Sequence, residues 1–215
     1  MTVPTRTYYY EFEVSLIGVT PRIWRRFQIR RNCTFHELHD TIQKACGWLD
    51  YHLYEFRECT GDEPYERGEW IACSPFMEPW EPDEVIPSAT QIRLDDHFPT
   101  GRDVKAIYVY DFGDNWRHLV EMKQVVQLQG TRRRHMLGGE RAFPPEDCGS
   151  LTGYEECVRA ASMPRAEVCR MEDSAVRDDL LQLKEWLGDW EPEHFDPAAA
   201  ARAFSRPVRY PDPYD

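Results

Sequence analysis

Residues 8–18 alternate regularly between apolar and polar side chains. Tyr10 and Phe12 fall on one face of this stretch, while Glu11 and Glu13 fall on the other. A period of two is typical of a strand that buries one face. The same signal predicts further strands at residues 23–29, 48–59 and 69–73, and a strand end followed by a turn of helix at 92–98.

Helical spacing first occurs at residues 34–46. Thr34 and Glu37 form a capping box at its start, and Gly47 is placed to end the helix. The buried stripe of this helix includes Leu38 and Ile42. Three more helices are predicted in the last third of the chain, at residues 152–161 and 174–187 and from Pro197 onward.

Between these regions lies a predicted hairpin, around which we expect the sheet to be organised. Residues 106–112 and 116–126 read as its strands. Residues 113–115, Gly-Asp-Asn, supply a turn of residue types that tolerate positive φ.

The loop length of this hairpin decides which residue faces Asp111. A loop of two or four residues sets Asp111 opposite His118, whereas a loop of three residues sets it opposite Arg117. We favour the even loops, because they also place Val109 across from Val120.

The order of elements predicts the α+β class. We expect a compact roll with an antiparallel or mixed sheet, with the helix at 34–46 on one face of it. Residues 1–128 would form the sheet core with the central hairpin. Residues 129–204 would be a loop, up to about residue 151, followed by C-terminal helices packed on the same domain, and residues 205–215 a tail.

Composition and charge restrict the function. The chain has 215 residues and a net charge of −12, which argues against non-specific binding to nucleic acid. It has no apolar run long enough to cross a bilayer and no signal peptide. We therefore expect a cytoplasmic protein whose seven cysteines are reduced. Two basic clusters run against the bulk charge: Arg22, Arg25, Arg26, Arg30 and Arg31, and then Arg132, Arg133, Arg134 and His135.

Asp111 and His118 are the candidate catalytic residues. A carboxylate that holds an imidazole in one tautomer is the arrangement that a general base needs. No serine or cysteine nucleophile is tied to the couple by local spacing. The alternative is a buried polar pair that fixes the hairpin.

Three histidines are candidate metal ligands: His36, His39 and His52. If they converge with Asp111 and His118, a divalent transition metal such as zinc becomes a plausible cofactor.

Aromatic, basic and loop residues complete the candidate binding surface. The aromatic side chains would stack on a partner, the arginines would bind an anion, and the acidic loop would hold a cation. These candidates are Trp24, Arg25, Arg26, Trp48, Trp116, Arg132, Arg133, Arg134, Glu146, Asp147, Cys148 and Tyr154.

Several motifs follow one another in fixed order. They are PRIWRR at 21–26, TFHELH at 34–39 leading to 47–53, YVYDFGDNWRH at 108–118, PPEDCG at 144–149 and WLGD at 186–189. Together they resemble the plasmid Ri open-reading-frame-three-like family, also labelled as a transposable-element passenger protein. The resemblance covers roughly residues 8–204.

This resemblance implies a bacterial or archaeal α+β roll without an established activity, associated with mobile elements. The residue patterns of serine and tyrosine recombinases are missing from the sequence. Many family members carry cysteines near the positions of Met136 and Phe143, beside the equivalent of Cys148. Here only Cys148 remains.

Two functional hypotheses follow. In the first, the protein is a binding module that recognises a protein or nucleic-acid partner through the aromatic hairpin and the arginine clusters. In the second, it is a small metal-dependent or hydrolase-like enzyme that uses the Asp–His couple.

Overall fold

The computed structural model describes residues 6–60, 67–79, 81–98, 104–130 and 132–208. Its strands are β1 (Arg6–Leu16), β2 (Trp24–Arg30), β3 (Tyr54–Cys59), β4 (Arg67–Cys73), β5 (Lys105–Tyr110), β6 (Trp116–Gln129) and β7 (Arg134–Glu140). Its helices are α1 (Phe35–Cys46), α2 (Leu94–His97), α3 (Ser150–Ser162), α4 (Arg165–Val168), α5 (Ser174–Leu187) and α6 (Pro197–Ala203).

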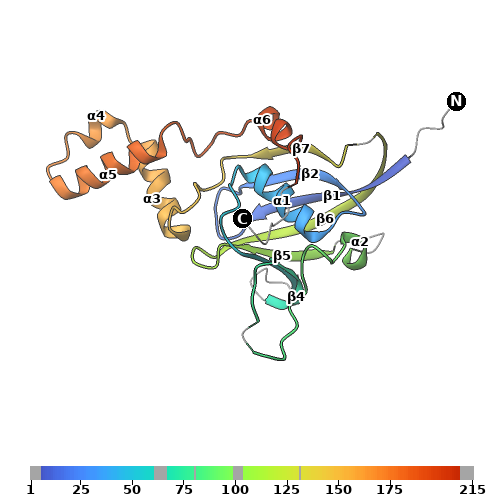
Figure 1. Cartoon of the computed structure of the whole chain (residues 1–215). Helices are drawn as coiled ribbons and strands as arrows, with labels where there is room; N and C mark the ends of the chain where they lie inside the picture. The colour runs from blue at the N-terminus through green and yellow to red at the C-terminus, as the bar shows by residue number, and fades with distance from the viewer. Residues whose placement is uncertain (1–5, 61–66, 80, 99–103, 131, 209–215) are drawn as a thin grey trace.

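The strands that the structure describes form one open sheet of seven, in the order β4-β3-β5-β6-β1-β2-β7. Each of the strand pairs is antiparallel. Helix α1 lies across one face of the sheet (Figure 1). The α+β fold predicted from the sequence is confirmed. None of the helices in the described part of the chain has the length and the apolar run that crossing a bilayer requires.

The ends of α1 are fixed as the sequence predicts. The Thr34 side chain accepts a hydrogen bond from the Glu37 N–H at 3.2 Å, and the Glu37 carboxylate accepts one from the Thr34 N–H at 2.9 Å. Gly47 closes the helix with φ at 86°. This left-handed conformation costs glycine little, because it has no Cβ.

Aromatic rings fill the space between α1 and the sheet. Phe35 of α1 packs edge-on against Phe56 of β3, with ring centroids 5.1 Å apart, and lies stacked against Phe98 at 5.8 Å. Phe12 of β1 meets Phe98 edge-on at 4.9 Å. Edge-to-face and offset pairs of this kind add to the free energy gained from burial alone.

Residues 48–53 do not continue the predicted strand. They form a loop, and β3 begins only at Tyr54. These residues have no neighbouring strand to pair with, although their side chains alternate. In addition, Asp50 takes a φ of 65°, which interrupts the extended backbone. His52 therefore lies on a loop at the end of the sheet.

The predicted loop at 129–151 contains an edge strand, β7, which pairs with β2. Its two glycines concealed the strand in the sequence. A Cβ at Gly139 would lie 2.7 Å from the carbonyl oxygen of Trp24 and 2.7 Å from Cδ of Arg25. The strand needs glycine there because β2 and the Arg25 side chain approach so closely.

The central hairpin forms with a different register from the one predicted. Tyr110 pairs with Trp116, and Tyr108 with His118. The connection therefore spans residues 111–115, five residues rather than two or four. The prediction that Asp111 lies opposite His118 is wrong, because Asp111 belongs to the turn and has a φ of 56°.

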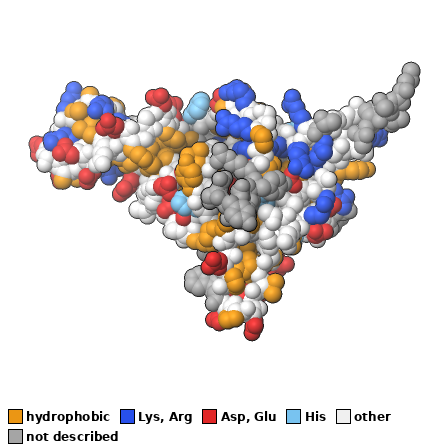
Figure 2. Space-filling view, viewed as in Figure 1, with side chains coloured by type: hydrophobic (Ala, Val, Ile, Leu, Met, Phe, Trp, Pro, Cys, Tyr) orange, Lys and Arg blue, Asp and Glu red, His pale blue; other side chains and the backbone are white. Residues whose placement is uncertain are grey.

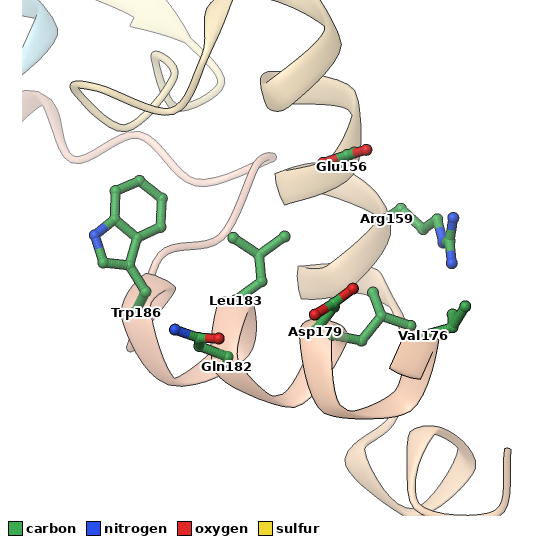
Figure 3. Close-up of a pocket in the computed structure, with 8 residues that line it drawn as sticks. Glu156, Arg159, Val176, Asp179, Gln182, Leu183 and Trp186 are labelled. Atoms are coloured by element: carbon green, nitrogen blue, oxygen red, sulfur yellow. The ribbon is translucent and has the colours of Figure 1, made fainter. Parts of the chain in front are cut away.

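Helices α3, α4 and α5 project to one side of the sheet (Figure 1) and enclose a small core of their own, which includes Cys157, Val168 and Leu180. A groove of about 600 Å³ lies between α3 and α5. Figure 3 shows Leu183 and Trp186 of α5 along it, with Arg159 of α3 opposite. It contains none of the site residues predicted from the sequence. Helix α6 returns to pack against α1 and β7 (Figure 1).

Arg134 joins β7 to α1 and to the segment after α6. Its side chain is buried and contacts the Asp40 carboxylate of α1. It also donates to the carbonyl oxygens of Phe204, at 2.9 Å, and Arg206, at 2.6 Å. A buried guanidinium needs such a complete set of acceptors to offset its loss of water.

We expect Arg134→Met to lower the free energy of unfolding by about 3 kcal/mol, because a buried charge pair is broken and one partner remains. Urea denaturation followed by circular dichroism measures this. The control is Arg202→Met, which removes an exposed arginine whose Nη2 lies 3.6 Å from Asp196 Oδ2. It should change the free energy of unfolding by less than about 1 kcal/mol. Equal losses in both variants would contradict the role given to Arg134.

Candidate functional site

Three loops meet at one end of the sheet. They are residues 47–53 before β3, residues 111–115 between β5 and β6, and residues 141–149 between β7 and α3. Tyr54 pairs with Tyr110, which in turn pairs with Trp116, so the first two loops leave neighbouring strands at the same edge.

Side chains from the core tie these loops together. Trp48 Nε1 donates to the carbonyl oxygen of Pro144 at 2.8 Å, and the Leu49 N–H donates to Glu146 Oε2 at 2.7 Å. The Tyr110 hydroxyl accepts from the Tyr51 N–H at 3.0 Å and donates to the other oxygen of Glu146. One tyrosine on β5 thus holds both the first and the third loop.

The Tyr110 hydroxyl stays protonated in this position. Burial raises its pKa, and the hydrogen bond to the Glu146 carboxylate raises it further. A neutral phenol that donates to a carboxylate is a strong hydrogen bond, since the acceptor is charged.

Strained backbone is concentrated in and beside the same loops. All six non-glycine residues with positive φ in the described part of the chain lie here: Asp50, Asp111, Asn115, Arg141, Asp147 and Ser150. Such conformations cost about 1 kcal/mol or more each and cluster at functional sites. Aspartate and asparagine tolerate them best, because their short side chains bond to the local backbone.

His52, Asp111 and Asp147 bring their donor atoms together, one from each loop. His52 Nε2 lies 2.7 Å from Asp147 Oδ1 and 3.7 Å from Asp111 Oδ2. One donor atom from each residue lies within 4.8 Å of the other two. We call this group the loop triad.

The loop triad is partly preorganised and partly open. Asp111 Oδ1 accepts from the N–H groups of Gly113, at 2.9 Å, and Asp114, at 3.3 Å, so its Oδ2 is left for His52. The side chain of Asp111 is 12% exposed, whereas that of Asp147 is 59% exposed. One side of the group is therefore fixed by the turn, and the other faces solvent.

Exposed apolar side chains border the loop triad. Leu49, Tyr51 and Leu53 flank His52 in sequence and are 56%, 68% and 36% exposed. Phe112, next to Asp111, is 42% exposed. Apolar residues gathered beside a polar cluster are typical of a ligand-binding surface.

The residues fit a divalent metal ion by the chemistry of their donors. One imidazole nitrogen and two carboxylate oxygens suit a first-row transition metal such as manganese, iron or zinc. Three protein ligands leave coordination positions for water or substrate, which distinguishes catalytic from structural zinc sites.

His36 and His39, predicted as metal ligands, do not join His52. His36 Nδ1 lies 2.8 Å from the Tyr54 hydroxyl. His39 Nδ1 lies 2.8 Å from the Tyr108 hydroxyl, and its Nε2 lies 2.7 Å from Asp50. Burial lowers the pKa of His39, and the Asp50 carboxylate opposes that shift. Both histidines serve as hydrogen-bond partners for buried tyrosines.

His118 lies in the core, separated from Asp111 by the hairpin register. Its ring meets Trp48 edge-on and stacks on Phe143, with centroids 5.4 and 5.8 Å away. Its Nδ1 is 3.3 Å from the Tyr108 carbonyl oxygen, and its buried Nε2 has no hydrogen-bond partner among the described residues. Burial lowers its pKa from the ordinary 6.5 to about 4.

The first arginine cluster is used within the fold. Arg25 is buried, and its guanidinium lies over the Phe195 ring, 3.9 Å from the centroid. Burial lowers its pKa to about 10. Arg26 pairs with Glu11, and Arg22 with Glu13. Arg25 is therefore not available on the surface for a partner, whereas the Arg26 side chain remains 40% exposed.

Several other predicted binding residues also have internal partners. Trp24 Nε1 donates to Glu140 at 3.1 Å. Trp116 and Tyr154 are buried. Cys148 packs against Cys157, and the hydrogen bond between the two thiols raises the pKa of Cys148. No disulfide is formed by the cysteines that the structure describes.

All three members of the loop triad were predicted from the sequence, but for separate roles: Asp111 as a catalytic residue, His52 as a metal ligand and Asp147 as a binding residue. Tyr110 and Asp50, which position the loops, were not predicted. The only sequence signal for Tyr110 was its place on a predicted strand, directly before Asp111.

Comparison with known proteins identifies the family. The model of the plasmid pRiA4b ORF-3-like proteins matches residues 8–199. The chain belongs to this family. An uncharacterized protein, y4hQ of Sinorhizobium fredii, is 31% identical over 156 residues, which cover 72% of this chain and 74% of that protein.

The solved structure of a similar protein confirms the fold. The crystal structure of a protein of unknown function from Methanosarcina mazei is 31% identical, with a TM-score of 0.71. The match covers 92% of this chain and 98% of that one. The resemblance seen in the sequence is thus confirmed, and both relatives are without an assigned activity.

His118 predicts an acid-sensitive fold. Its pKa is lower in the folded protein, at about 4, than in the unfolded chain, at 6.5, so the unfolded chain binds more protons between these values. The free energy of unfolding should therefore fall as the pH drops from 6.5 to 4, by about 3 kcal/mol from this residue. Above pH 6.5 His118 is neutral in both states, and the free energy of unfolding no longer depends on its titration.

His118→Phe keeps a flat ring and removes the titrating group. We expect this variant to lose stability less steeply than the wild type between pH 6.5 and 4, by urea denaturation at fixed ionic strength. His194→Phe, an exposed site, is the matched control and should keep the wild-type pH dependence. An unchanged slope in His118→Phe would contradict the argument.

Proposed function

We propose that this protein is a metal-dependent enzyme of hydrolytic type, with a divalent cation held by His52, Asp111 and Asp147. The observation that carries the proposal is the convergence of one imidazole nitrogen and two carboxylates from three loops within 4.8 Å. The anchoring of these loops supports the proposed metal site further, since metal sites depend on the groups that orient their ligands.

Each ligand has a separate source of support. Asp111 is oriented by the two N–H groups of its own turn. Asp147 follows Glu146, whose carboxylate is held by Tyr110 and the Leu49 N–H. His52 lies between Tyr51, whose N–H is bound by Tyr110, and the start of β3.

When bound, a divalent cation would lower the pKa of a coordinated water and polarise a substrate oxygen. The chain's own residues supply the rest of the site. Asp147 lies on the solvent side, and the exposed Leu49, Tyr51 and Phe112 offer an apolar surface for the body of a substrate. This combination favours a substrate with an apolar part next to the group that is cleaved.

The alternative is a binding module for a protein or nucleic-acid partner, connected through the family to plasmids and mobile elements. The burial of Arg25 beneath the Phe195 ring removes part of its support. A cytoplasmic location accords with either function, because the cysteines are free thiols.

Removal of any one member of the loop triad should weaken metal binding. We expect His52→Ala, Asp111→Asn and Asp147→Asn each to reduce the affinity for Mn²⁺ or Zn²⁺ by about 100-fold, because each removes one of three ligands. Isothermal titration calorimetry on metal-free protein measures this. Asparagine is chosen because it tolerates positive φ and leaves an oxygen for the turn of residue 111.

His194→Ala is the matched control, since it removes an exposed histidine far along the chain. It should bind metal as the wild type does. Wild-type affinity in all three triad variants, or an equal loss in His194→Ala, would refute the proposed centre.

Tyr110→Phe tests the anchoring of the loops. Without the hydroxyl, Glu146 loses a donor and the Tyr51 N–H loses its acceptor, so we expect metal affinity to fall about tenfold while all three ligands remain. Tyr8→Phe, which alters an exposed tyrosine, should have no effect. Unchanged affinity in Tyr110→Phe would show that the loops are held without this hydrogen bond.

A further inference from the structure

A second cavity lies away from the loop triad, between the start of β7 and the segment that follows α6. Its volume is about 740 Å³. That is within the range of small-molecule sites, roughly 300–1,000 Å³. We call it the arginine basin. It is lined by Arg132, Arg133, Arg134, Ala201, Arg202, Phe204, Ser205, Arg206, Pro207 and Val208.

The basin is strongly basic on a protein whose net charge is −12. Half of its lining residues are arginines. Figure 2 shows Lys and Arg side chains gathered over α6 and β7. Three of the five arginines have an acidic partner: Arg133 pairs with Glu37, Arg134 with Asp40, and Arg202 with Asp196.

Arg132 and Arg206 have no carboxylate partner for their guanidinium groups among the described residues, while their backbones are fixed. The Arg132 carbonyl oxygen accepts from the Tyr9 hydroxyl at 2.6 Å. The Arg206 carbonyl oxygen accepts from Arg134 Nη2 at 2.6 Å. The two uncompensated charges are therefore presented from anchored backbone positions, one just before β7 and one in the segment after α6.

This lining indicates the chemical class of the ligand. Guanidinium groups bind phosphate through paired, parallel hydrogen bonds, which lysine does not provide. Phe204, Pro207 and Val208 give the basin an apolar wall, so a ligand with an organic body fits better than a bare ion. A nucleic-acid chain is less favoured, since its many phosphates would meet the negative surface of the rest of the protein.

We propose that the arginine basin binds a small organic phosphate of nucleotide size, with its phosphate groups between Arg132 and Arg206. This site is independent of the loop triad, with which it shares no residue.

The test is a titration of the full chain with ATP, in EDTA to exclude metal effects. We expect saturable binding in the micromolar range. Arg132→Gln and Arg206→Gln should each weaken it about tenfold or more, because each removes a charged hydrogen bond to phosphate. Both variants should fold normally, since these guanidinium groups pair with no carboxylate of the described structure. Circular dichroism checks this.

Arg165→Gln on α4 is the matched control, since it removes an exposed arginine outside the basin. It should bind ATP as the wild type does, as should Asp111→Asn, which disables the loop triad. Inorganic phosphate should compete only weakly, because it lacks the organic body.

Three results would overturn the proposal. The first is the lack of saturable ATP binding below about 1 mM, the weak end of specific affinity. The second is an equal loss in Arg165→Gln, which would indicate general charge attraction. The third is tighter binding of a 12-nucleotide single-stranded DNA than of ATP, which would assign the basin to nucleic acid.

Discussion

The structure depends on satisfying the tyrosine hydroxyls that the sheet buries beneath α1. A buried hydroxyl without a partner is costly, so each one requires a polar group at a defined place. His36 meets Tyr54, and His39 and Gln43 meet Tyr108. These contacts fix the position of α1 on the sheet and explain why a helix that packs on an aromatic core carries so many polar residues on its buried side.

The same requirement extends outward to the loops. His39 uses its second nitrogen to hold Asp50, and Tyr110, two residues beyond Tyr108 on β5, holds Tyr51 and Glu146. The core therefore positions the segments that carry His52 and Asp147. Because the loops are held at several points, their strained residues persist, as expected where neighbouring structure over-determines the backbone.

The arginines show how burial separates residues that look alike in the sequence. Arg25 and Arg134 are enclosed and bonded to carbonyl groups, so they stabilise the fold. Arg132 and Arg206 keep their charged groups exposed. Arg132 and Arg206 supply the uncompensated positive charge of the basin. Arg134 also lines the basin, but its charge is already used by Asp40, which limits what it can offer to a ligand.

The sequence by itself determined the family, the α+β class and the ends of α1, because periodicity and capping are local properties. It also singled out His52, Asp111 and Asp147. The tertiary structure alone decided which of them meet. The even loop length favoured from the sequence misplaced Asp111. The turn at residues 111–115 is instead shaped by the Asp111 side chain, which accepts a hydrogen bond from the Gly113 N–H. Edge strand β7 was hidden because it contains glycines, and Gly139 is required by contact with β2, a long-range constraint that no local pattern contains.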